Sequence, residues 1–514
     1  MAKKPKLTAD DLLTRGYFHD RAIPPLTSVE LQPALSELKS LSAQLQHLRS
    51  RCVQHSVPKR KHLRRLLSIP NPLHQTALAV EVEKHWSKLE TYLKNSSISL
   101  SVPSLSSARA LETTRGINEL PAERSLRSVG ARYVLKTDLA RFYPSIYTHS
   151  VPWAIHGKEK ARKDKSLYGN ALDKCLRDTQ DKQTGGIPIG PDTSFLVGEI
   201  IGTAIDIRLQ DSLPVAGTRF IDDYYLYFQT QREAEHALAL LHKIAKEFEL
   251  EVNDPKTEVM LMPEELEPAW KTELRGFQLR TAAQPQSTDL IALFNRGFAL
   301  ANQFATDNVL TYVAKQVLSS DIDANNWALC ESLIMKAAIA EPTALSTIID
   351  ILDKNSSSIT TTENLLKTVA SICSYHAPLE QGYEVAWALW LAKTQKLSVP
   401  DKLAKSVATM DDDIVAMVAL HLREMGLFPD VPMARWRNLM KAANLYTEHW
   451  LLAYEAFEQG WLTTHRDYIA ADPVFSVLRK HGVRFYDAGR TLPPPTSTGY
   501  EDEGIEIDYD DRSE

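Results

Sequence analysis

The run Thr218-Arg-Phe-Ile-Asp-Asp-Tyr-Tyr-Leu-Tyr-Phe228 places two adjacent carboxylates between two apolar, strand-like stretches. Such a junction predicts a hairpin whose tip projects Asp222 and Asp223 out of a sheet. A second strand-like run, Tyr133-Val-Leu-Lys-Thr-Asp138, also ends in an acid. If the two strands are neighbours, three carboxylates gather at one edge of the sheet. By itself, an Asp-Asp pair more often marks a turn than a catalytic site.

The three acids Asp138, Asp222 and Asp223 offer only hard oxygen ligands, which favour Mg²⁺ or Mn²⁺. Two such ions would activate an attacking oxygen and stabilise the leaving group of an in-line phosphoryl displacement. Three carboxylates from two neighbouring strands are therefore able to hold two ions for phosphoryl transfer, although the acidic pair considered alone is weak evidence.

Five short segments around these acids follow one another in a fixed order. They are Asp138-Leu-Ala-Arg-Phe-Tyr-Pro-Ser-Ile146, Gly186-Ile-Pro-Ile-Gly-Pro-Asp-Thr-Ser194, Phe220-Ile-Asp-Asp223, Asn253-Asp-Pro-Lys-Thr257 and Leu274-Arg-Gly-Phe277. This succession resembles palm motifs A, B, C, D and E of reverse transcriptases, with matching spacing. One match would carry little weight, whereas five in order across about 140 residues are specific. The resemblance implies an α+β fold with the fingers and palm of a right-hand polymerase.

The resemblance also implies a role for each matching acid. The first carboxylates of motifs A and C, here Asp138 and Asp222, bind the catalytic metals in the family. The second carboxylate of motif C, Asp223, is less directly bound. Tyr143 matches the steric gate, whose bulk excludes a ribose 2′-hydroxyl, so the resemblance implies dNTP substrates. A core tyrosine on a packed turn is the alternative for Tyr143.

Four further residues are nucleotide-binding candidates by the same resemblance. Gly190 matches the motif B glycine, whose missing side chain lets the backbone approach the nucleotide or the template base. Lys256 matches the motif D lysine, a proton donor for the pyrophosphate leaving group, with a solvent-facing lysine beside a turn as the alternative. Arg109 and Arg115 lie where fingers residues grip the triphosphate, although the local match is poor.

Motif B departs from the common pattern at Ile189, which replaces the usual glutamine, and in the following Pro191-Asp-Thr-Ser194. This variant is similar to the abortive-infection and defence-associated reverse transcriptases of bacteria. Residues 15–25, 383–390 and 450–457 resemble the same subclass. The aromatic residues of the last two segments are expected to be core residues rather than ligands.

These features predict a reverse transcriptase-type DNA polymerase of bacterial antiphage defence. Some relatives use a noncoding RNA, and others extend DNA without a template from a protein tyrosine. Tyr486, Tyr500 and Tyr509 are mobile-looking candidates for such priming, although ordinary tail tyrosines are the simpler interpretation. Two alternatives stay open: RNA synthesis by the same palm, and a catalytically silent palm that serves as a nucleic-acid-binding assembly scaffold.

The net charge of −6, from 59 basic and 65 acidic residues in a chain of 514, hides a strong asymmetry. Residues 1–182 carry a net charge of +14, residues 183–290 carry −9 and residues 291–514 carry −11. A basic front is what a polyphosphate partner requires. Residues 49–65 hold seven basic side chains and no acid, for which a solvated helix face is the alternative interpretation.

Composition also bears on the cellular setting. No run approaches ~18 apolar residues, which excludes a transmembrane helix. The basic N-terminus lacks the apolar segment of a secretion signal. The four cysteines show no metal-ligand spacing and fit free thiols in a reducing compartment. We therefore expect a cytoplasmic protein without a membrane partner.

The chain divides into four predicted parts. Residues 1–100 form a helical, basic region with the start of the fingers, and residues 101–290 form the fingers and palm. Residues 291–490 are expected to form an all-α helical-repeat domain, because periodic segments of helix length recur with short breaks. Residues 491–514 are expected to be a flexible acidic tail. A net charge of only −4 over residues 291–496 favours protein contacts, so we expect a homo-oligomer formed through the helical domain.

Overall fold

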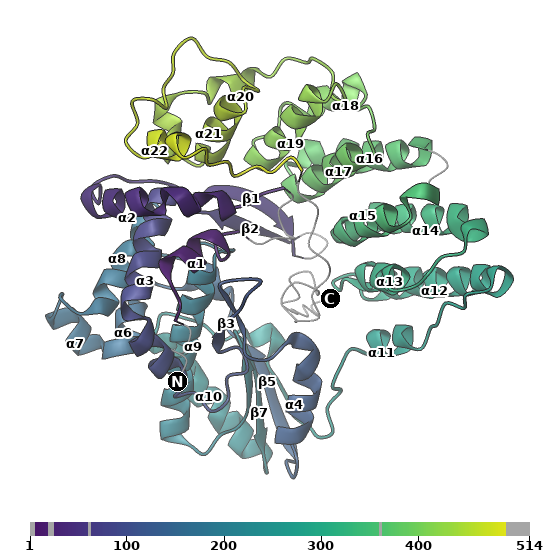
Figure 1. Cartoon of the computed structure of the whole chain (residues 1–514). Coiled ribbons are helices and arrows are strands. Elements are labelled where there is room, and N and C mark those ends of the chain that lie inside the picture. Colours follow the sequence, from purple (N-terminus) through teal and green to yellow (C-terminus); the bar gives the residue numbers. More distant parts are fainter. Residues whose placement is uncertain (1–5, 19–24, 60–62, 359–361, 490–514) are drawn as a thin grey trace, which may run out of the picture.

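The computed structural model describes residues 6–18, 25–59, 63–358 and 362–489. The first half of the chain mixes helices and strands around a four-stranded sheet, and the second half is helical and arches over the first (Figure 1). The expected α+β first half and helical second half are both present. The predicted boundary at residue 290 falls inside a helix, α12 (Ala283–Gln303), which belongs to the helical stack.

The central sheet has the strand order β6-β7-β5-β8, and every pairing in it is antiparallel. Its strands are β5 (Tyr133–Asp138), β6 (Ala216–Phe220), β7 (Asp223–Phe228) and β8 (Glu258–Leu261). The strands predicted from the runs around Asp138 and Asp222 are thus confirmed. Because β5 pairs with β7, the two acidic runs are neighbours in space.

Two long helices, α9 (Asp192–Ser212) and α10 (Gln231–Glu247), form the helical layer beside the sheet. α10 begins after Thr230, whose side chain accepts a hydrogen bond from the Glu233 N–H while the Glu233 carboxylate bonds back to Thr230. Its buried residues recur at three- and four-residue steps and face the sheet. α9 is buried along most of its length and forms the centre of this half.

A separate two-stranded hairpin, β1 (Val53–Pro58) with β2 (Arg64–Ile69), occupies the basic stretch of residues 49–65. The interpretation of this stretch as a solvated helix face is therefore wrong. Burial alternates along β1, with Val53, His55 and Val57 inside, which is the two-residue period of a strand. The basic side chains leave this period intact, because they lie on the flanks of β1 and at the start of β2.

The rest of the first half surrounds the hairpin and the sheet. Within residues 25–50, ten residues form an α-helix, α2 (Leu35–Gln44). The remaining elements are α1 (Ala9–Thr14), α3 (Pro72–Leu93), β3 (Pro103–Leu105), β4 (Leu111–Thr113), α4 (Leu120–Arg127), α5 (Phe142–Ser145), α6 (Ser150–His156), α7 (Lys158–Lys163), α8 (Tyr168–Asp178) and α11 (Ala269–Arg275).

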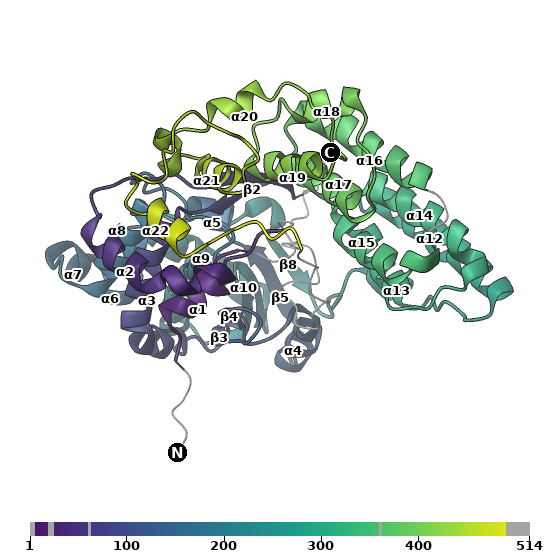
Figure 2. The same ribbon diagram turned by 45° about the horizontal axis from the view of Figure 1, so that its top comes forward.

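The helical half is a curved stack in which alternate helices touch, for example α13 with α15, α15 with α17 and α17 with α19 (Figures 1 and 2). The fully buried side chains of Trp387, Trp390, Trp450 and Tyr454 confirm the core interpretation of these aromatic residues. Because no sequence period accompanies the stacking, the helical-repeat class stays a prediction. Besides α12, the helices are α13 (Val309–Leu318), α14 (Trp327–Ala340), α15 (Leu345–Lys354), α16 (Thr362–His376), α17 (Gly382–Thr394), α18 (Asp401–Val407), α19 (Asp413–Glu424), α20 (Ala434–Asn438), α21 (Trp450–Glu458) and α22 (Phe475–Lys480).

The end of the helical half returns to the N-terminal region. The Thr27 N–H donates to the Phe485 carbonyl at 2.9 Å, and Leu26 forms a β-bridge with Tyr486. The expectation of a mobile Tyr486 is wrong, because this residue is 2% exposed and its hydroxyl lies 2.9 Å from Nδ1 of His421. Tyr500, Tyr509 and the predicted tail lie outside the described residues. Among the described helices, none has the length and apolar character needed to cross a bilayer.

Candidate active site

The acidic pair forms the tip of the β6–β7 hairpin, as the sequence predicts. Phe220 pairs with Asp223 across the strands, so Ile221 and Asp222 are the two turn residues. Ile221 has a φ of 55°, and tight two-residue hairpin turns require such positive φ angles. Asp222 therefore projects from the end of the hairpin, where it is 1% exposed.

Asp138 ends β5 directly opposite Asp223 of β7. Residues opposite one another in an antiparallel pair project their side chains from the same face of the sheet. In addition, the Leu139 N–H donates to the carbonyl of Asp222 at 3.3 Å, which ties the end of β5 to the hairpin tip. The structure thus brings the three predicted metal-binding acids together at one sheet edge.

Lys256 completes this acidic cluster. Its Nζ lies 2.9 Å from Oδ2 of Asp138, and its side chain is 9% exposed. Burial raises the pKa of Asp138, and the Lys256 ammonium partly offsets the rise. Burial, together with the charges of Asp222 and Asp138, raises the pKa of Asp223 well above its usual range. Carboxylates that repel one another in this way gain stability from an added cation.

The chemistry of the cluster fits a hard divalent ion. Oδ1 of Asp138 is buried and has no hydrogen-bonding partner among the described residues, so this oxygen can serve as a ligand. The three acids offer only oxygen, the donor that Mg²⁺ and Mn²⁺ prefer. Within the part of the chain that the structure describes, no group of three His, Cys, Asp or Glu side chains already has the arrangement that would hold a metal ion. The two-ion centre therefore stays a prediction.

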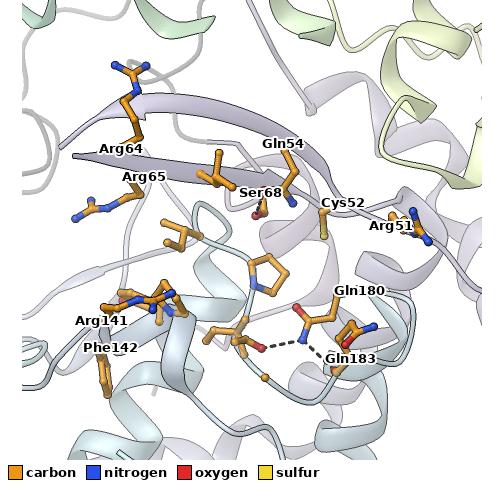
Figure 3. A pocket seen from close by; sticks show the side chains of 18 of the residues that line it. Arg51, Cys52, Gln54, Arg64, Arg65, Ser68, Arg141, Phe142, Gln180 and Gln183 are labelled. Atoms are coloured by element: carbon orange, nitrogen blue, oxygen red, sulfur yellow. Dashed lines mark hydrogen bonds between the residues drawn. The ribbon is translucent and has the colours of Figure 1, made fainter. Parts of the chain in front are cut away.

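A cavity of about 720 Å³ adjoins the cluster and has Asp222 in its wall. Its other walls come from the β1–β2 hairpin, the turn after β5 and the loop before α9 (Figure 3). Tyr143 of that turn and Ile189 of that loop both line it. A space of this size lies within the range of small-molecule binding sites.

Basic side chains outnumber acidic ones in the cavity wall, whose acids are Asp181, Asp222 and Glu448. Figure 3 shows Arg64 and Arg65 on the hairpin and Arg141 on the segment below it. Basic side chains that share a wall with the predicted metal ligand Asp222 suit a polyphosphate ligand. The sequence does not single out these residues as nucleotide contacts, although the unbroken basic stretch indicates where two of them lie. The basic lining residues are Arg51, Lys59, Arg64, Arg65 and Arg141.

Residues 57–288 match the family model described as reverse transcriptase (RNA-dependent DNA polymerase). The chain therefore contains a reverse transcriptase domain. The matched region includes the acidic cluster, α9 and most of the basic hairpin. No curated protein matches the chain, so the match identifies the domain and not a subclass.

Within the reverse transcriptase domain, Tyr143 is 8% exposed. A Cβ added at Gly198 of α9 would lie 3.2 Å from the Tyr143 ring, so glycine at 198 makes room for this ring. The Tyr143 carbonyl accepts a hydrogen bond from the Ile187 N–H at 3.0 Å, which joins the motif A turn to the motif B loop. Tyr143 is thus packed on one side and faces the cavity on another.

Gly190 has a φ of 135°, a conformation that residues with a side chain rarely adopt. The adjacent Ile189 carbonyl accepts a hydrogen bond from the Ser68 N–H of β2 at 2.8 Å. This bond attaches the basic hairpin of the reverse transcriptase domain to the motif B loop. Backbone conformation by itself therefore requires glycine at position 190, and its approach to a nucleotide stays a prediction.

The two upstream arginines do not meet the acidic cluster in this structure. Arg109 is 4% exposed, and its Nε donates to Asp192 at the start of α9 at 3.1 Å. Arg115 lies at the surface, where its Nε is 3.1 Å from Glu123. A triphosphate contact by Arg109 or Arg115 stays a prediction.

The helical half holds the basic hairpin in place. Nη2 of Arg64 donates to Glu384 of α17 at 2.8 Å, and Nη1 of Arg64 bonds to the other oxygen of the same carboxylate. Nδ1 of His55 lies 2.8 Å from Oδ2 of Asp412, and both side chains are buried. These partners come 320 and 357 positions later in the chain. One wall of the cavity is therefore positioned by residues outside the reverse transcriptase domain.

Proposed function

We propose that this chain is a reverse transcriptase-type DNA polymerase of bacterial antiphage defence. The observation that carries the polymerase activity is the carboxylate cluster of Asp138, Asp222 and Asp223 beside a cavity with a largely basic wall. The defence role is supported by the resemblance of motif B, and of the helical half, to the abortive-infection subclass.

The proposed reaction is attack by a 3′-hydroxyl, or by a protein hydroxyl, on the α-phosphorus of a dNTP. A new O–P bond forms as the hydroxyl loses its proton to solvent, the bond between the α-phosphorus and the oxygen bridging to the β-phosphate breaks, and pyrophosphate leaves. Two Mg²⁺ or Mn²⁺ ions held by Asp138, Asp222 and Asp223 would supply Lewis-acid chemistry for attack and departure. Lys256, whose ammonium lies 2.9 Å from the proposed metal ligand Asp138, would give a proton to the pyrophosphate.

The cavity wall would bind and select the nucleotide. Lys59, Arg65 and Arg141 offer charge-assisted hydrogen bonds to the triphosphate. Tyr143 would fill the space of a 2′-hydroxyl, so that dNTPs are preferred. Gly190 would let the backbone approach the base. Arg109 and Arg115 remain candidate triphosphate contacts, but each would first have to leave its present carboxylate partner.

Incorporation of labelled dNTPs by the purified chain, with Mg²⁺ or Mn²⁺, tests this proposal. Asp222→Asn should lower incorporation by at least about 1000-fold, because loss of a metal ligand raises the activation free energy by several kcal/mol. Asp211→Asn is the matched control, since Asp211 is an exposed residue near the end of α9. Equal incorporation by wild type and Asp222→Asn would remove the catalytic role of the cluster.

A comparison of dNTPs with rNTPs separates the two polymerase alternatives. Tyr143→Ala should raise rNTP incorporation relative to dNTP incorporation by about tenfold or more, because it opens the space of the 2′-hydroxyl. An unchanged preference would exclude Tyr143 as the gate. A wild type that prefers rNTPs would favour RNA synthesis, and one that incorporates neither would favour the silent scaffold.

The proposed partners are a noncoding RNA, the DNA product and further copies of the chain. Sequencing of nucleic acid that co-purifies with the protein, with and without protease, identifies a dedicated RNA or covalently attached DNA. Light scattering with nucleic acid present tests assembly through the helical half, and a monomer would contradict it. Phage challenge of cells carrying wild type or Asp222→Asn tests the defence role.

A further inference from the structure

Asp222 directly follows a residue with a strained backbone. Ile221 has a φ of 55°, in the left-handed region where a β-branched side chain is a rare outlier. Its side chain is also buried, with 4% of the residue exposed. Such strain persists only where the surroundings fix the conformation. The surroundings of Ile221 therefore bear on the direction in which Asp222 projects.

Both peptide groups of Ile221 are held by buried side chains. Its N–H donates to Oγ of Ser101 at 2.7 Å, and its carbonyl accepts from Nη1 of Arg219 at 2.7 Å. Ser101 and Arg219 are both 0% exposed. The two peptide planes that flank Ile221, including the one shared with Asp222, are thus fixed.

Glu199 of α9 joins these two side chains into one network. Its carboxylate accepts from Ser101 Oγ at 2.7 Å and from the Arg219 guanidinium at 2.9 and 3.1 Å. The guanidinium also pairs with Asp206 at 2.8 Å. Replacing such buried ions by apolar side chains is often neutral or stabilising in proteins, so stability alone gives little reason for the network. A geometric role provides that reason.

Helix α9 is shaped to admit this arginine. A Cβ at Gly202 would lie 2.7 Å from Cζ of Arg219. Gly198, one helical turn earlier, admits the ring of Tyr143 in the same way. One face of α9 thus supports both the hairpin tip and the tyrosine that lines the cavity.

We propose that Ser101 and Arg219, joined by Glu199, are positioning residues that hold Ile221 in its strained conformation and so aim the Asp222 carboxylate into the acidic cluster. The inference rests on the proposed function, in which Asp222 binds a divalent ion. Ser101 and Arg219 act through the Ile221 backbone and make no contact with substrate.

Ser101→Ala tests the inference, because it removes the oxygen that accepts the Ile221 N–H. Ser99→Ala is the matched control: Oγ of Ser99 donates to the same Glu199 carboxylate at 3.0 Å, while the Ile221 N–H bonds to Ser101. Titration with Mn²⁺, followed by electron paramagnetic resonance, measures ion affinity without turnover. Ser101→Ala should raise the Kd for Mn²⁺ about tenfold or more and lower kcat similarly, while the dNTP KM stays within about twofold. Ser99→Ala should resemble the wild type.

The same substitution made in an Ile221→Gly protein separates a positioning role of Ser101 from a general contribution to stability. Glycine adopts a φ of 55° without strain, so Ile221→Gly removes the need to hold this conformation. Ser101→Ala should therefore change the Kd for Mn²⁺ less in the Ile221→Gly background than in the wild type. Equal effects in both backgrounds would overturn the inference.

The remaining outcomes distinguish this inference from the proposed function. If Ser101→Ala and Ser99→Ala lower the unfolding midpoint alike and leave Mn²⁺ binding unchanged, the network is structural and the inference fails. If the wild type incorporates no dNTP but Ser101→Ala still weakens Mn²⁺ binding, the polymerase proposal fails and the positioning role stands. A wild type that binds no more Mn²⁺ than Asp222→Asn overturns both.

Discussion

The acidic β6–β7 hairpin and the basic β1–β2 hairpin both line the cavity, yet they are stabilised from different parts of the chain. The acidic hairpin belongs to the four-stranded sheet, and its tip is held by Ser101 and Arg219 of the same domain. The basic hairpin is a two-stranded sheet of its own. Its attachments, the buried pair His55–Asp412 and the partly buried pair Arg64–Glu384, lead to the helical half.

This difference assigns a structural purpose to the helical half. An isolated two-stranded hairpin is marginally stable in water, so the basic wall of the cavity needs external support. The helices provide it through buried polar pairs, and Trp450 of α21 adds a hydrogen bond from Nε1 to the Ile69 carbonyl at the end of β2. The carboxylate side of the site is thus local to the reverse transcriptase domain, whereas the basic side depends on both halves.

The largest loss of stability is expected from His55→Ala, which removes one attachment of the basic hairpin to the helical half. It leaves a buried oxygen of Asp412 without its donor and creates a cavity, so the free energy of unfolding should fall by about 3–5 kcal/mol. His47→Ala, at an exposed histidine nearby, should change it by less than about 0.5 kcal/mol. Chemical denaturation measures both. A loss below about 1 kcal/mol for His55→Ala would show that the hairpin does not depend on this attachment.

The pH dependence of stability is the next largest expected effect, and the buried carboxyls of Glu341 and of Glu455 on α21 both contribute to it. Burial raises the pKa of each of these carboxyls from 4.5 to about 7. The folded protein then keeps protons that the unfolded chain releases, so the free energy of unfolding should fall as pH rises from about 4.5 to about 7. Glu455 accounts for at most about 3 kcal/mol of this fall.

Glu455 connects this titration to the basic hairpin. Its Oε1 accepts a hydrogen bond from the Phe485 N–H. The Phe485 ring packs edge-on against the Trp450 ring, with 5.3 Å between the ring centroids. Glu455→Gln should flatten the stability profile between pH 4.5 and 7, as measured by urea denaturation at several pH values. An identical slope in the variant would assign the titration to another group.

A smaller effect is expected from Arg65→Ala in the wall of the cavity. Loss of one charge-assisted contact to a triphosphate costs about 1.5–3 kcal/mol, so the dNTP KM should rise about 10- to 100-fold with a smaller change in kcat. Arg232→Ala, at an exposed position on α10, is the control. Equal KM values for wild type and Arg65→Ala would place the triphosphate elsewhere.

The smallest effect is expected where hairpin and helices meet at the surface. Nη1 of Arg51 lies 3.4 Å from Glu448, but the two side chains are 59% and 42% exposed. Solvent and salt screen such pairs, so Glu448→Gln should change the free energy of unfolding by less than about 0.5 kcal/mol. A loss comparable to that of His55→Ala would contradict the view that buried contacts hold the hairpin.

The sequence predicted the acidic side of the site well. Asp138, Asp222 and Asp223 meet at the sheet edge, and Lys256 joins them, because each lies in a short motif whose strand or turn is decided by neighbouring residues. Tyr143 also lines the cavity. The roles of these residues in catalysis and nucleotide binding remain predictions until the variants are measured.

The basic side was predicted poorly. The stretch of residues 49–65 was open to interpretation as a helix face, because its charge pattern conceals the alternation of buried residues on β1. Arg109 was expected near a triphosphate, yet it pairs with Asp192. Arg109 and the basic hairpin are both held by residues of other elements: Asp192 of α9 for Arg109, and Glu384 and Asp412 of the helical half for the hairpin. A single sequence contains no signal that identifies such partners.

The sequence by itself determined the order of the polymerase motifs, the strands that carry the acids and the helical character of the second half. The strands and the helical character follow from residue periodicity and turn chemistry, which act over a few positions, whereas the motif order follows from the resemblance to reverse transcriptases. Only the tertiary structure decided that α9 glycines admit Arg219 and Tyr143, and that Glu384 and Asp412 hold the basic hairpin. Such pairings depend on how distant elements pack, because burial selects a partner by position in space rather than by position in the chain.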